Sequence, residues 1–390
     1  MTRGDQLPIG VIGAGTMGAG IAQVAATNGH PVVVYDLSES ARENARSGLE
    51  KILARQVEKN RLTASEADAI AGRIRFTPSI DDLGNADLVI EAIIEDLQAK
   101  CELFHAVEKT VGPDAVIATN TSSLSVTAIA ASTACHERCI GLHFFNPAAL
   151  MPLVEVVPAL QTAEQTLTRA RSLVDGWGKT TVVARDTPGF IVNRIARPFY
   201  GEALRVLDEG LADVATIDWA MKKVCGFRMG PFELMDLIGI DINYAVTETV
   251  FAAFFYDPRY RPSFTQKRMV EAGLLGRKTG RGYYDHAPSS DRPEPVRDSG
   301  LANSISARIL TMLINEAVDA VFWNVASVQD IDLAMTKGVN YPKGLLRWAD
   351  EIGLERVLAR LTQLQHEYGE DRYRPSPLLR RMVREDLTFY

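Results

Sequence analysis

The sequence has few cysteines and no recognisable secretion signal. Its 390 residues include four cysteines, and none of them forms a CxxC pair. The first fifteen residues contain no charged region followed by a long apolar run, which is the pattern that directs a chain to secretion. We therefore expect a cytoplasmic protein with free thiols. Cys135 and Cys139 flank His136, but a zinc site needs further ligands and none is evident nearby, so we expect no metal.

The sequence also lacks an excess of positive charge. It has 42 lysines and arginines against 49 aspartates and glutamates, which gives a net charge of −7. A chain of this balance has no long-range field that attracts phosphate backbones, so we expect neither nucleic acid nor a membrane as a partner. Because single cores usually stop growing at roughly 250 to 300 residues, we expect two or three domains.

A glycine-rich turn near the N-terminus indicates a dinucleotide site. The segment "GAGTMG" contains Gly13, Gly15 and Gly18, and it lies between a short apolar run and an alanine-rich helical stretch. A second apolar run ends at Asp36, at about the spacing that this motif requires. Asp36 is placed to accept hydrogen bonds from ribose hydroxyls and to repel a 2′-phosphate, so we predict NAD as the cofactor. The alternative is a structural glycine turn followed by a surface aspartate.

Further apolar runs alternate with helical patterns. Runs at residues 86–93 and 114–120 each precede a helical stretch, which is typical of a parallel, doubly wound sheet. We predict an α/β class, with a Rossmann-type domain over residues 1–185. Between Asp36 and Arg75 we expect a charged helical hairpin, either a plain surface hairpin or a ligand-binding one.

The segment "GLHFFNPAALMPLVEV" contains a histidine and a glutamate on two predicted strands. His143 ends the first strand and Glu155 lies in the second, with a turn-rich link between them. Oxidation of a secondary alcohol needs a base for the hydroxyl proton, and a neutral imidazole is suited to this near neutral pH. A carboxylate on the other ring nitrogen fixes the tautomer. We predict His143 as the base and Glu155 as its partner; taken alone, such a pair is more often structural.

Two further segments place polar side chains where ligands of doubly wound sheets collect. "TNTSSLSV" offers Asn120, Ser122 and Ser123 after a predicted strand, and "DTPGFIVNRI" offers Asn193 at the start of a helix. The alternatives are that the serines cap a helix and that Asn193 is a buried polar residue of a helix.

Seven segments occur in the order that is typical of the L-3-hydroxyacyl-CoA dehydrogenases, and the chain resembles that family over residues 7–285. The segments are "GVIGAGTMGAGIAQVAA", "EAIIEDLQAK", "TNTSSL", "GLHFFNPAALMPLVEVV", "DTPGFIVNR", "MGPFELMDLIGID" and "GRKTGRGYYD". The resemblance implies NAD-dependent oxidation of a 3-hydroxyacyl-CoA to the 3-oxoacyl-CoA.

The resemblance also implies roles for particular residues. His143 is then the base and Glu155 its partner, while Ser122 and Asn193 bind the reacting hydroxyl or the thioester oxygen. The residues that then line the NAD site are Gly13, Gly15, Thr16, Met17, Gly18, Asp36, Glu95, Lys100, Asn120, Asn146 and Lys278. In the family a basic side chain of the helical hairpin holds coenzyme A. Arg55 is the nearest match by position, and Lys51 or Lys59 are alternatives.

The part after Asp186 contains an internal duplication. At a constant offset of 114 positions, Arg194 and Glu202 of the first copy recur as Arg308 and Glu316 of the second. We therefore predict two tandem helical domains, at residues 186–286 and 300–390, with a polar linker between them. The second copy has Ala307 where the first has Asn193, so we expect one active site per chain. We hypothesise that the second copy takes the place of the homodimer partner of single-copy family members.

The tandem arrangement and the segment "GVNYPKG" resemble the 3-hydroxybutyryl-CoA or 3-hydroxyadipyl-CoA dehydrogenases of bacterial phenylacetate breakdown. We expect a short (S)-3-hydroxyacyl-CoA as substrate. Two other classes remain open: a sugar-acid or hydroxy-acid dehydrogenase of the same superfamily, and a non-catalytic NAD-binding structural protein. The "HFFNP" segment favours the acyl-CoA branch.

Overall fold

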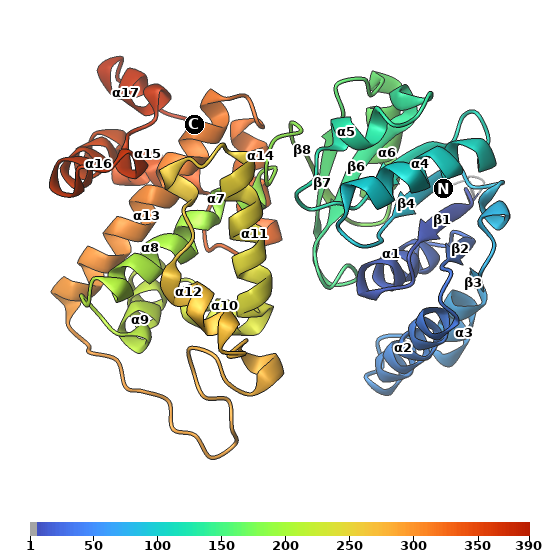
Figure 1. Cartoon of the computed structure of the whole chain (residues 1–390), viewed down its shortest axis with the longest axis horizontal. Helices are drawn as coiled ribbons and strands as arrows, with labels where there is room; N and C mark the ends of the chain where they lie inside the picture. The colour runs from blue at the N-terminus through green and yellow to red at the C-terminus, as the bar shows by residue number, and fades with distance from the viewer. Residues whose placement is uncertain (1–5) are drawn as a thin grey trace. The chain divides into compact units, whose positions relative to one another are not determined.

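The computed structural model describes residues 6–390 (Figure 1). The chain divides into two compact units, one that ends at Thr187 and one that spans Pro188–Tyr390. The first is an α/β unit and the second is helical, so the predicted fold class is confirmed. The division of the second unit into two tandem domains stays a prediction.

The first unit is built on a sheet with the strand order β3-β2-β1-β4-β5-β6-β7-β8. All neighbouring strands pair in parallel except β6 and β7, which pair antiparallel. The strands are β1 (Ile9–Ile12), β2 (Val32–Tyr35), β3 (Ile74–Thr77), β4 (Leu88–Glu91), β5 (Val116–Thr119), β6 (Cys139–Phe144), β7 (Leu153–Pro158) and β8 (Thr180–Val183). The chain crosses from β3 back to β4 beside β1, so the strand order reverses there, which is where such sheets bind ligands.

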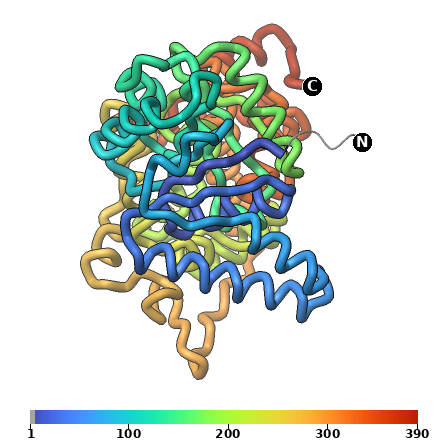
Figure 2. Tube along the Cα trace, turned by 90° about the vertical axis from the view of Figure 1, so that its right-hand side faces the viewer, coloured from blue at the N-terminus to red at the C-terminus, as the bar shows by residue number. Residues whose placement is uncertain are grey.

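Helices connect these strands. They are α1 (Thr16–Thr27), α2 (Glu39–Glu58), α3 (Ala64–Gly72), η1 (Ile80–Leu83), α4 (Leu97–Thr110), α5 (Val126–Ala130), η2 (His136–Arg138) and α6 (Glu164–Gly176). Helices α2 and α3 form the predicted hairpin, and Figures 1 and 2 show it along the edge of the sheet at β2 and β3. The hydroxyl of Ser38 caps α2, and Thr63 with Glu66 forms a capping box at α3, so the sequence itself sets both helix starts.

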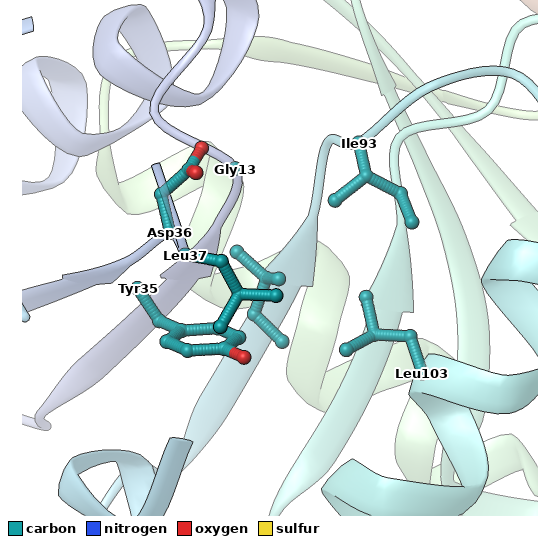
Figure 3. Close-up of a pocket in the computed structure, with 7 residues that line it drawn as sticks. Gly13, Tyr35, Asp36, Leu37, Ile93 and Leu103 are labelled. Atoms are coloured by element: carbon teal, nitrogen blue, oxygen red, sulfur yellow. The ribbon is translucent and has the colours of Figure 1, made fainter. Parts of the chain in front are cut away.

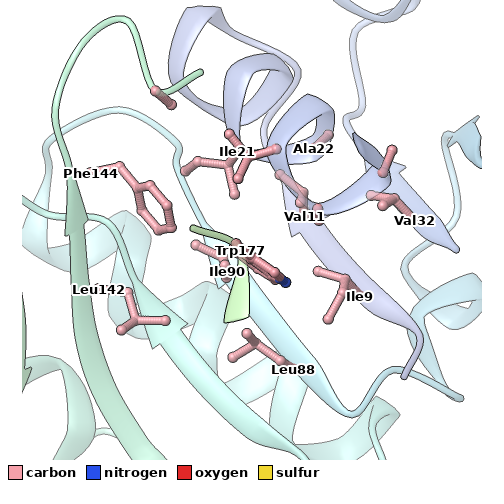
Figure 4. Close-up of a cluster of buried hydrophobic side chains, with 14 of the residues drawn as sticks. Ile9, Val11, Ile21, Ala22, Val32, Leu88, Ile90, Leu142, Phe144 and Trp177 are labelled. Carbon is pink, nitrogen blue, oxygen red and sulfur yellow. The ribbon is translucent and has the colours of Figure 1, made fainter. Parts of the chain in front are cut away.

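The hydrophobic core of this unit lies between the sheet and its covering helices (Figure 4). Val11 and Ile90 project from adjacent strands toward Ile21 and Ala22 of α1, and all four are at most 1% exposed. Each buried branched side chain of this size contributes about 1.5–3 kcal/mol. The core thereby fixes the ends of β1 and β4, which are the strands that border the glycine turn.

The second unit consists of helices packed around α13. Its elements are α7 (Val192–Ile195), α8 (Arg197–Asp208), α9 (Val214–Cys225), α10 (Pro231–Ile238), α11 (Ile240–Ala253), η3 (Pro258–Tyr260), α12 (Phe264–Glu271), η4 (Arg277–Thr279), α13 (Ser299–Phe322), α14 (Val328–Gly338), α15 (Leu345–Ile352), α16 (Leu354–Tyr368), η5 (Asp371–Tyr373) and α17 (Pro377–Arg384). Helix α13 contacts α8 and α9 from the first copy and α15 to α17 from the second (Figure 1). Its middle is buried on all sides, so it belongs to the core rather than to the surface.

The two copies of the duplicated segment exchange equivalent ion pairs. Nε of Arg194 lies 2.6 Å from a carboxylate oxygen of Glu316, and Nε of Arg308 lies 3.0 Å from one of Glu202. All four side chains are at most 5% exposed. The arginine of each copy thus meets the equivalent glutamate of the other copy, which is the contact pattern of a two-fold interface. A second equivalent pair extends the pattern: Arg259 to Glu316 and Arg372 to Glu202.

Candidate active site

The glycine turn between β1 and α1 has the shape that a dinucleotide requires. Gly13 has a φ of +99°, and a Cβ there would lie 2.6 Å from the carbonyl oxygen of Ala92. A Cβ on Gly18 would lie 1.8 Å from the carbonyl oxygen of Gly13, so α1 packs directly on the turn. A Cβ on Gly15, in contrast, would meet nothing within 4 Å. This open space at the N-terminus of α1 is where a pyrophosphate approaches the backbone, so the turn fits a dinucleotide.

Asp36 lies directly after β2, at the rim of an open hollow of about 190 Å³ (Figure 3). One carboxylate oxygen accepts from the backbone N–H of Ala14 at 2.7 Å, and the other accepts from that of Ser38 at 2.8 Å. Each oxygen keeps a second lone pair for a ribose hydroxyl. The lining residues are Ile12, Gly13, Tyr35, Asp36, Leu37, Ile93 and Leu103. Mostly apolar walls beside a fixed carboxylate suit the adenine and ribose of an unphosphorylated dinucleotide.

Glu95 organises the loop that follows β5. One of its carboxylate oxygens accepts from the hydroxyl of Thr121 at 2.7 Å, from the backbone N–H of Ser122 at 2.8 Å and from that of Ser123 at 3.2 Å. Both serine hydroxyls also lie 3.2 Å from that oxygen. Burial alone would raise the pKa of Glu95, but the Lys100 ammonium and these hydrogen bonds hold it below its usual value. The loop is therefore set around a carboxylate that stays ionised.

Lys100 connects this loop to the sheet through a residue that the sequence analysis missed. Its Nζ lies 2.5 Å from Glu91 and 3.4 Å from Glu95, and the side chains of Lys100 and Glu91 are each 1% exposed. Glu91, the last residue of β4, also accepts from the backbone N–H of Ile93 and from the hydroxyl of Thr119. The only signal in the sequence was an acidic residue at the end of an apolar strand. Lys100 thus holds two carboxylates, and its predicted contact with NAD stays a prediction.

His143 and Glu155 lie opposite each other in the antiparallel pair β6–β7. They are register partners, and Nδ1 of the histidine lies 2.6 Å from a carboxylate oxygen of the glutamate. His143 is 6% exposed and Glu155 is fully buried. The Phe145 ring lies 4.5 Å from the imidazole, centroid to centroid. Their predicted proximity is confirmed, and an ionised carboxylate at this distance favours the tautomer with the proton on Nδ1.

The remaining predicted residues are distributed over both units. Asn120 accepts a hydrogen bond from the backbone N–H of Phe144 at 2.8 Å, so it ties the end of β5 to the end of β6. Asn146 is exposed in the turn after β6. Asn193 in α7 and Lys278 in η4 belong to the second unit, where Nζ of Lys278 lies 2.6 Å from Asp241.

The hairpin does not single out one basic residue for coenzyme A. Arg55 lies in the last turn of α2, and its side chain is exposed. Lys51 and Lys59 are exposed as well. The assignment of Arg55 therefore stays a prediction, with the same two alternatives.

Over residues 6–390 the structure shows neither a cluster of metal ligands nor a helix that could span a membrane. No group of three or more histidine, cysteine, aspartate or glutamate side chains is placed to hold a metal ion there. Within the same residues, no helix is both long and apolar enough to cross a bilayer. Cys139 is buried, which raises the pKa of its thiol to about 12, so it is unreactive at neutral pH.

Three features define a nucleotide-dependent dehydrogenase: a dinucleotide turn, an acidic residue after β2 and an imidazole–carboxylate pair on the neighbouring strands β6 and β7. Comparison with known proteins narrows this class. The family model "3-hydroxyacyl-CoA dehydrogenase, NAD binding domain" matches residues 8–187, and the model of the C-terminal domain matches residues 189–286 and 305–388. The chain belongs to the 3-hydroxyacyl-CoA dehydrogenase family, as the sequence motifs predict.

Similar proteins are known from several bacteria. The chain is 40% identical to the 3-hydroxyadipyl-CoA dehydrogenase of Escherichia coli, over 95% of this chain and 96% of that protein. It is 41% identical to the 3-hydroxybutyryl-CoA dehydrogenase of Bradyrhizobium diazoefficiens, over 74% of this chain and 98% of that one. The crystal structure of 3-hydroxybutyryl-CoA dehydrogenase from Escherichia coli K12 matches with a TM-score of 0.93 and 38% identity, and it covers 98% of this chain and 99% of that chain. The predicted cofactor, NAD, is thus confirmed at the level of the family.

Proposed function

We propose that the protein catalyses the NAD-dependent oxidation of a short-chain (S)-3-hydroxyacyl-CoA to the 3-oxoacyl-CoA. The observation that carries this proposal is the buried His143–Glu155 pair, 2.6 Å apart, in the unit that holds the glycine turn. An imidazole with one nitrogen fixed by a carboxylate is an efficient acceptor for a hydroxyl proton. The relatives named above act on 3-hydroxyacyl-CoA substrates according to their names, which supports the same substrate class here.

His143 performs the proton transfer in this proposal. Its Nε2 takes the proton from the 3-hydroxyl, while Glu155 keeps the proton on Nδ1 and stabilises the imidazolium that forms. Bound NAD supplies the nicotinamide carbon that accepts the hydride from C3 of the substrate. Ser122, whose loop is fixed by Glu95, orients the hydroxyl or the thioester oxygen. Asn193 is proposed for the same task.

The other proposed ligands follow the family motifs. NAD is held by the glycine turn with Thr16 and Met17, and by Asp36 at the adenosine ribose. Lys278, Asn146 and Asn120 are proposed to complete the NAD site together with Glu95 and Lys100. Coenzyme A is proposed to bind through Arg55, or through Lys51 or Lys59, on the exposed face of the hairpin.

The acyl group is proposed to be 3-hydroxybutyryl or 3-hydroxyadipyl, and the pathway phenylacetate breakdown. Relatives with both names match at about the same identity, 40% and 41%, so identity does not separate them. A series of 3-oxoacyl-CoA thioesters assayed with NADH separates them. A kcat/KM that peaks at acetoacetyl-CoA supports the 3-hydroxybutyryl group, and a peak at 3-oxoadipyl-CoA supports the 3-hydroxyadipyl group.

Turnover of free 3-hydroxybutyrate or gulonate without any turnover of thioesters would contradict the proposal and favour a hydroxy-acid or sugar-acid dehydrogenase. NAD binding without turnover of any acyl-CoA would favour a structural protein.

We also propose that the second helical copy takes the place of a partner subunit. The reciprocal pairs Arg194–Glu316 and Arg308–Glu202 support this, because two identical subunits related by a two-fold axis make such contacts. The protein is proposed to act in the cytoplasm. Its four cysteines carry free thiols, which suits a reducing compartment.

A further inference from the structure

Arg42 lies beside the carboxylate that selects the cofactor. It is in the first turns of α2, and its Nη1 donates to the carbonyl oxygens of Asp36 at 2.6 Å and of Leu37 at 3.1 Å. In residues 6–390, no carboxylate oxygen lies within 4.0 Å of the Arg42 guanidinium. The guanidinium therefore carries an unneutralised charge next to the residue that faces the adenosine ribose.

The surroundings of Asp36 leave room for a group larger than a hydroxyl. The carboxylate lies at the rim of the open hollow, next to Gly13 (Figure 3). Leu37, which follows it, is 78% exposed, and Ser38 and Ser40 are exposed as well. A phosphate on the ribose 2′-oxygen would meet the Asp36 carboxylate first. That carboxylate would repel the phosphate, although the Arg42 guanidinium lies 2.6 Å from the carbonyl oxygen of the same residue.

We propose that Arg42 is a latent 2′-phosphate ligand that Asp36 keeps from being used, so that Asp36 alone excludes NADP. Once the carboxylate is removed, Arg42 exchanges two hydrogen bonds to neutral carbonyls for charge-assisted bonds to the phosphate. A guanidinium presents five donors in a planar fork that matches phosphate oxygens, and such bonds are roughly twice as strong as neutral ones. An arginine near the end of the second strand is also the general means by which this fold accommodates a 2′-phosphate.

The competing explanation is that Arg42 only fastens the turn between β2 and α2. The two explanations differ in their effect on the two cofactors. A fastening role makes Arg42 equally important for NADH and NADPH. A ligand role makes it important for NADPH alone, and only when Asp36 is absent.

The test uses the full-length chain with Asp36→Ser, alone and combined with Arg42→Ala. The matched control combines Asp36→Ser with Arg46→Ala, because Arg46 lies one turn later on α2, with its guanidinium over the Phe76 ring instead of at the turn. Dissociation constants for NADPH and NADH are measured by fluorescence titration. If Asp36→Ser does not fold, Asp36→Asn removes the charge at nearly constant shape and gives the same comparison.

We expect Asp36→Ser to bind NADPH more tightly than the parent chain. Adding Arg42→Ala to this variant should weaken NADPH binding by about tenfold or more, since hydrogen bonds to charged groups contribute that much. The affinity for NADH should differ little between Asp36→Ser and its combination with Arg42→Ala. The control that combines Asp36→Ser with Arg46→Ala should bind NADPH as tightly as Asp36→Ser alone. Equal NADPH affinity in the Arg42→Ala and Arg46→Ala combinations, or no NADPH binding by an Asp36 variant that still binds NADH, would overturn the proposal. The inference rests on the proposed use of NAD. That assignment is checked separately by NADH binding to the unaltered chain, and the role of Arg42 by the difference between the two combinations.

Discussion

The imidazole of His143 is the group on which the proposed reaction depends most directly. Glutamine at this position keeps the approximate size of the side chain but does not accept a proton. We expect His143→Gln to lower kcat by about 10²- to 10⁴-fold, the usual contribution of a general base. The affinity for NADH should stay within about threefold, because the glycine turn and Asp36 lie on other strands. Stopped-flow and titration measurements check both, and a variant with nearly full activity would reject His143 as the base.

The buried pair Glu91–Lys100 gives a prediction of stability. Lys100→Met leaves the carboxylate of Glu91 without its counter-charge, and breaking such a pair typically costs about 3–5 kcal/mol. The double variant Glu91→Gln/Lys100→Met removes both charges and should recover much of the loss. Urea unfolding of the parent, both single variants and the double variant measures the coupling. Additive losses in the double variant would show that the pair is not coupled.

At the scale of single residues, the sequence predicts the proposed catalytic and cofactor-binding residues better than the residues that hold them in place. His143, Glu155 and Asp36 could be found because each lies in or directly after a predicted strand, with a spacing that the chemistry explains. Glu91 could not be found in this way. Its partner Lys100 follows on the next helix, and only the packing of α4 on the sheet brings the two side chains together.

The loop between β5 and α5 depends on the charge of Glu95. Since the folded protein lowers the pKa of this carboxyl, ionised Glu95 stabilises the fold at neutral pH, and this contribution is lost as the pH falls through that lowered pKa. We expect the difference in unfolding free energy between the parent and Glu95→Gln to be largest near pH 7 and to shrink below about pH 4. Unfolding curves of both proteins at four pH values test this. A constant difference across that range would contradict it.

The start of α10 gives a prediction that can be tested twice, because the second copy contains an equivalent arrangement. The Asp218 carboxylate accepts from the backbone N–H groups of Phe232 and Glu233, and a Cβ on Gly230 would lie 2.3 Å from it. In the second copy Asp332 and Gly344 show the same arrangement at 2.3 Å. We expect Gly230→Ala and Gly344→Ala each to lower the Tm, because the added methyl displaces the carboxylate that caps the helix.

Gly48 is the control for this prediction. It lies inside α2, and a Cβ there meets nothing within 4 Å. Gly48→Ala should therefore stabilise the protein by roughly 0.5–1 kcal/mol. Differential scanning calorimetry of the three variants is the measurement. A Tm that rises in all three would show that the caps have room for a methyl group.

Most elements of the first unit follow from periodicity, and the exceptions have a physical cause. The glycine turn, the helical hairpin and the strands β6 and β7 were predicted at nearly their observed places. Strands β3 and β8 were not, because "IRFT" and "TTVV" each contain two polar residues and so form no continuous apolar run. The short turn-rich link between β6 and β7 accounts for their antiparallel pairing, whereas the parallel pairing of β7 with β8 depends on where α6 packs.

At the scale of the whole molecule, the sequence shows clearly that the helical part is duplicated. It does not show how the two copies contact each other. The offset of 114 positions establishes two copies, but it does not say that the copies face each other. The reciprocal ion pairs add this information: each buried glutamate, Glu202 and Glu316, is neutralised by arginines from the other copy. A chain that lacks one copy therefore retains two buried arginines and a buried glutamate without their partners.

Deletion of residues 295–390 tests this arrangement. The shortened chain exposes the face of α8 and α9 that α13 covers, and it leaves Arg194 and Arg259 without Glu316 and Glu202 without Arg308. An exposed apolar surface that also carries unpaired charges favours either aggregation or association with a second shortened chain. We expect light scattering after size-exclusion chromatography to find aggregates or a dimer, and a dimer should bind NADH as the parent does. If the dimer forms, Glu202→Gln in the shortened chain should weaken it, because Glu202 would meet Arg194 or Arg259 of the second molecule in place of its lost partners. A shortened chain that stays soluble and monomeric would show that the second copy does not stand in for a subunit.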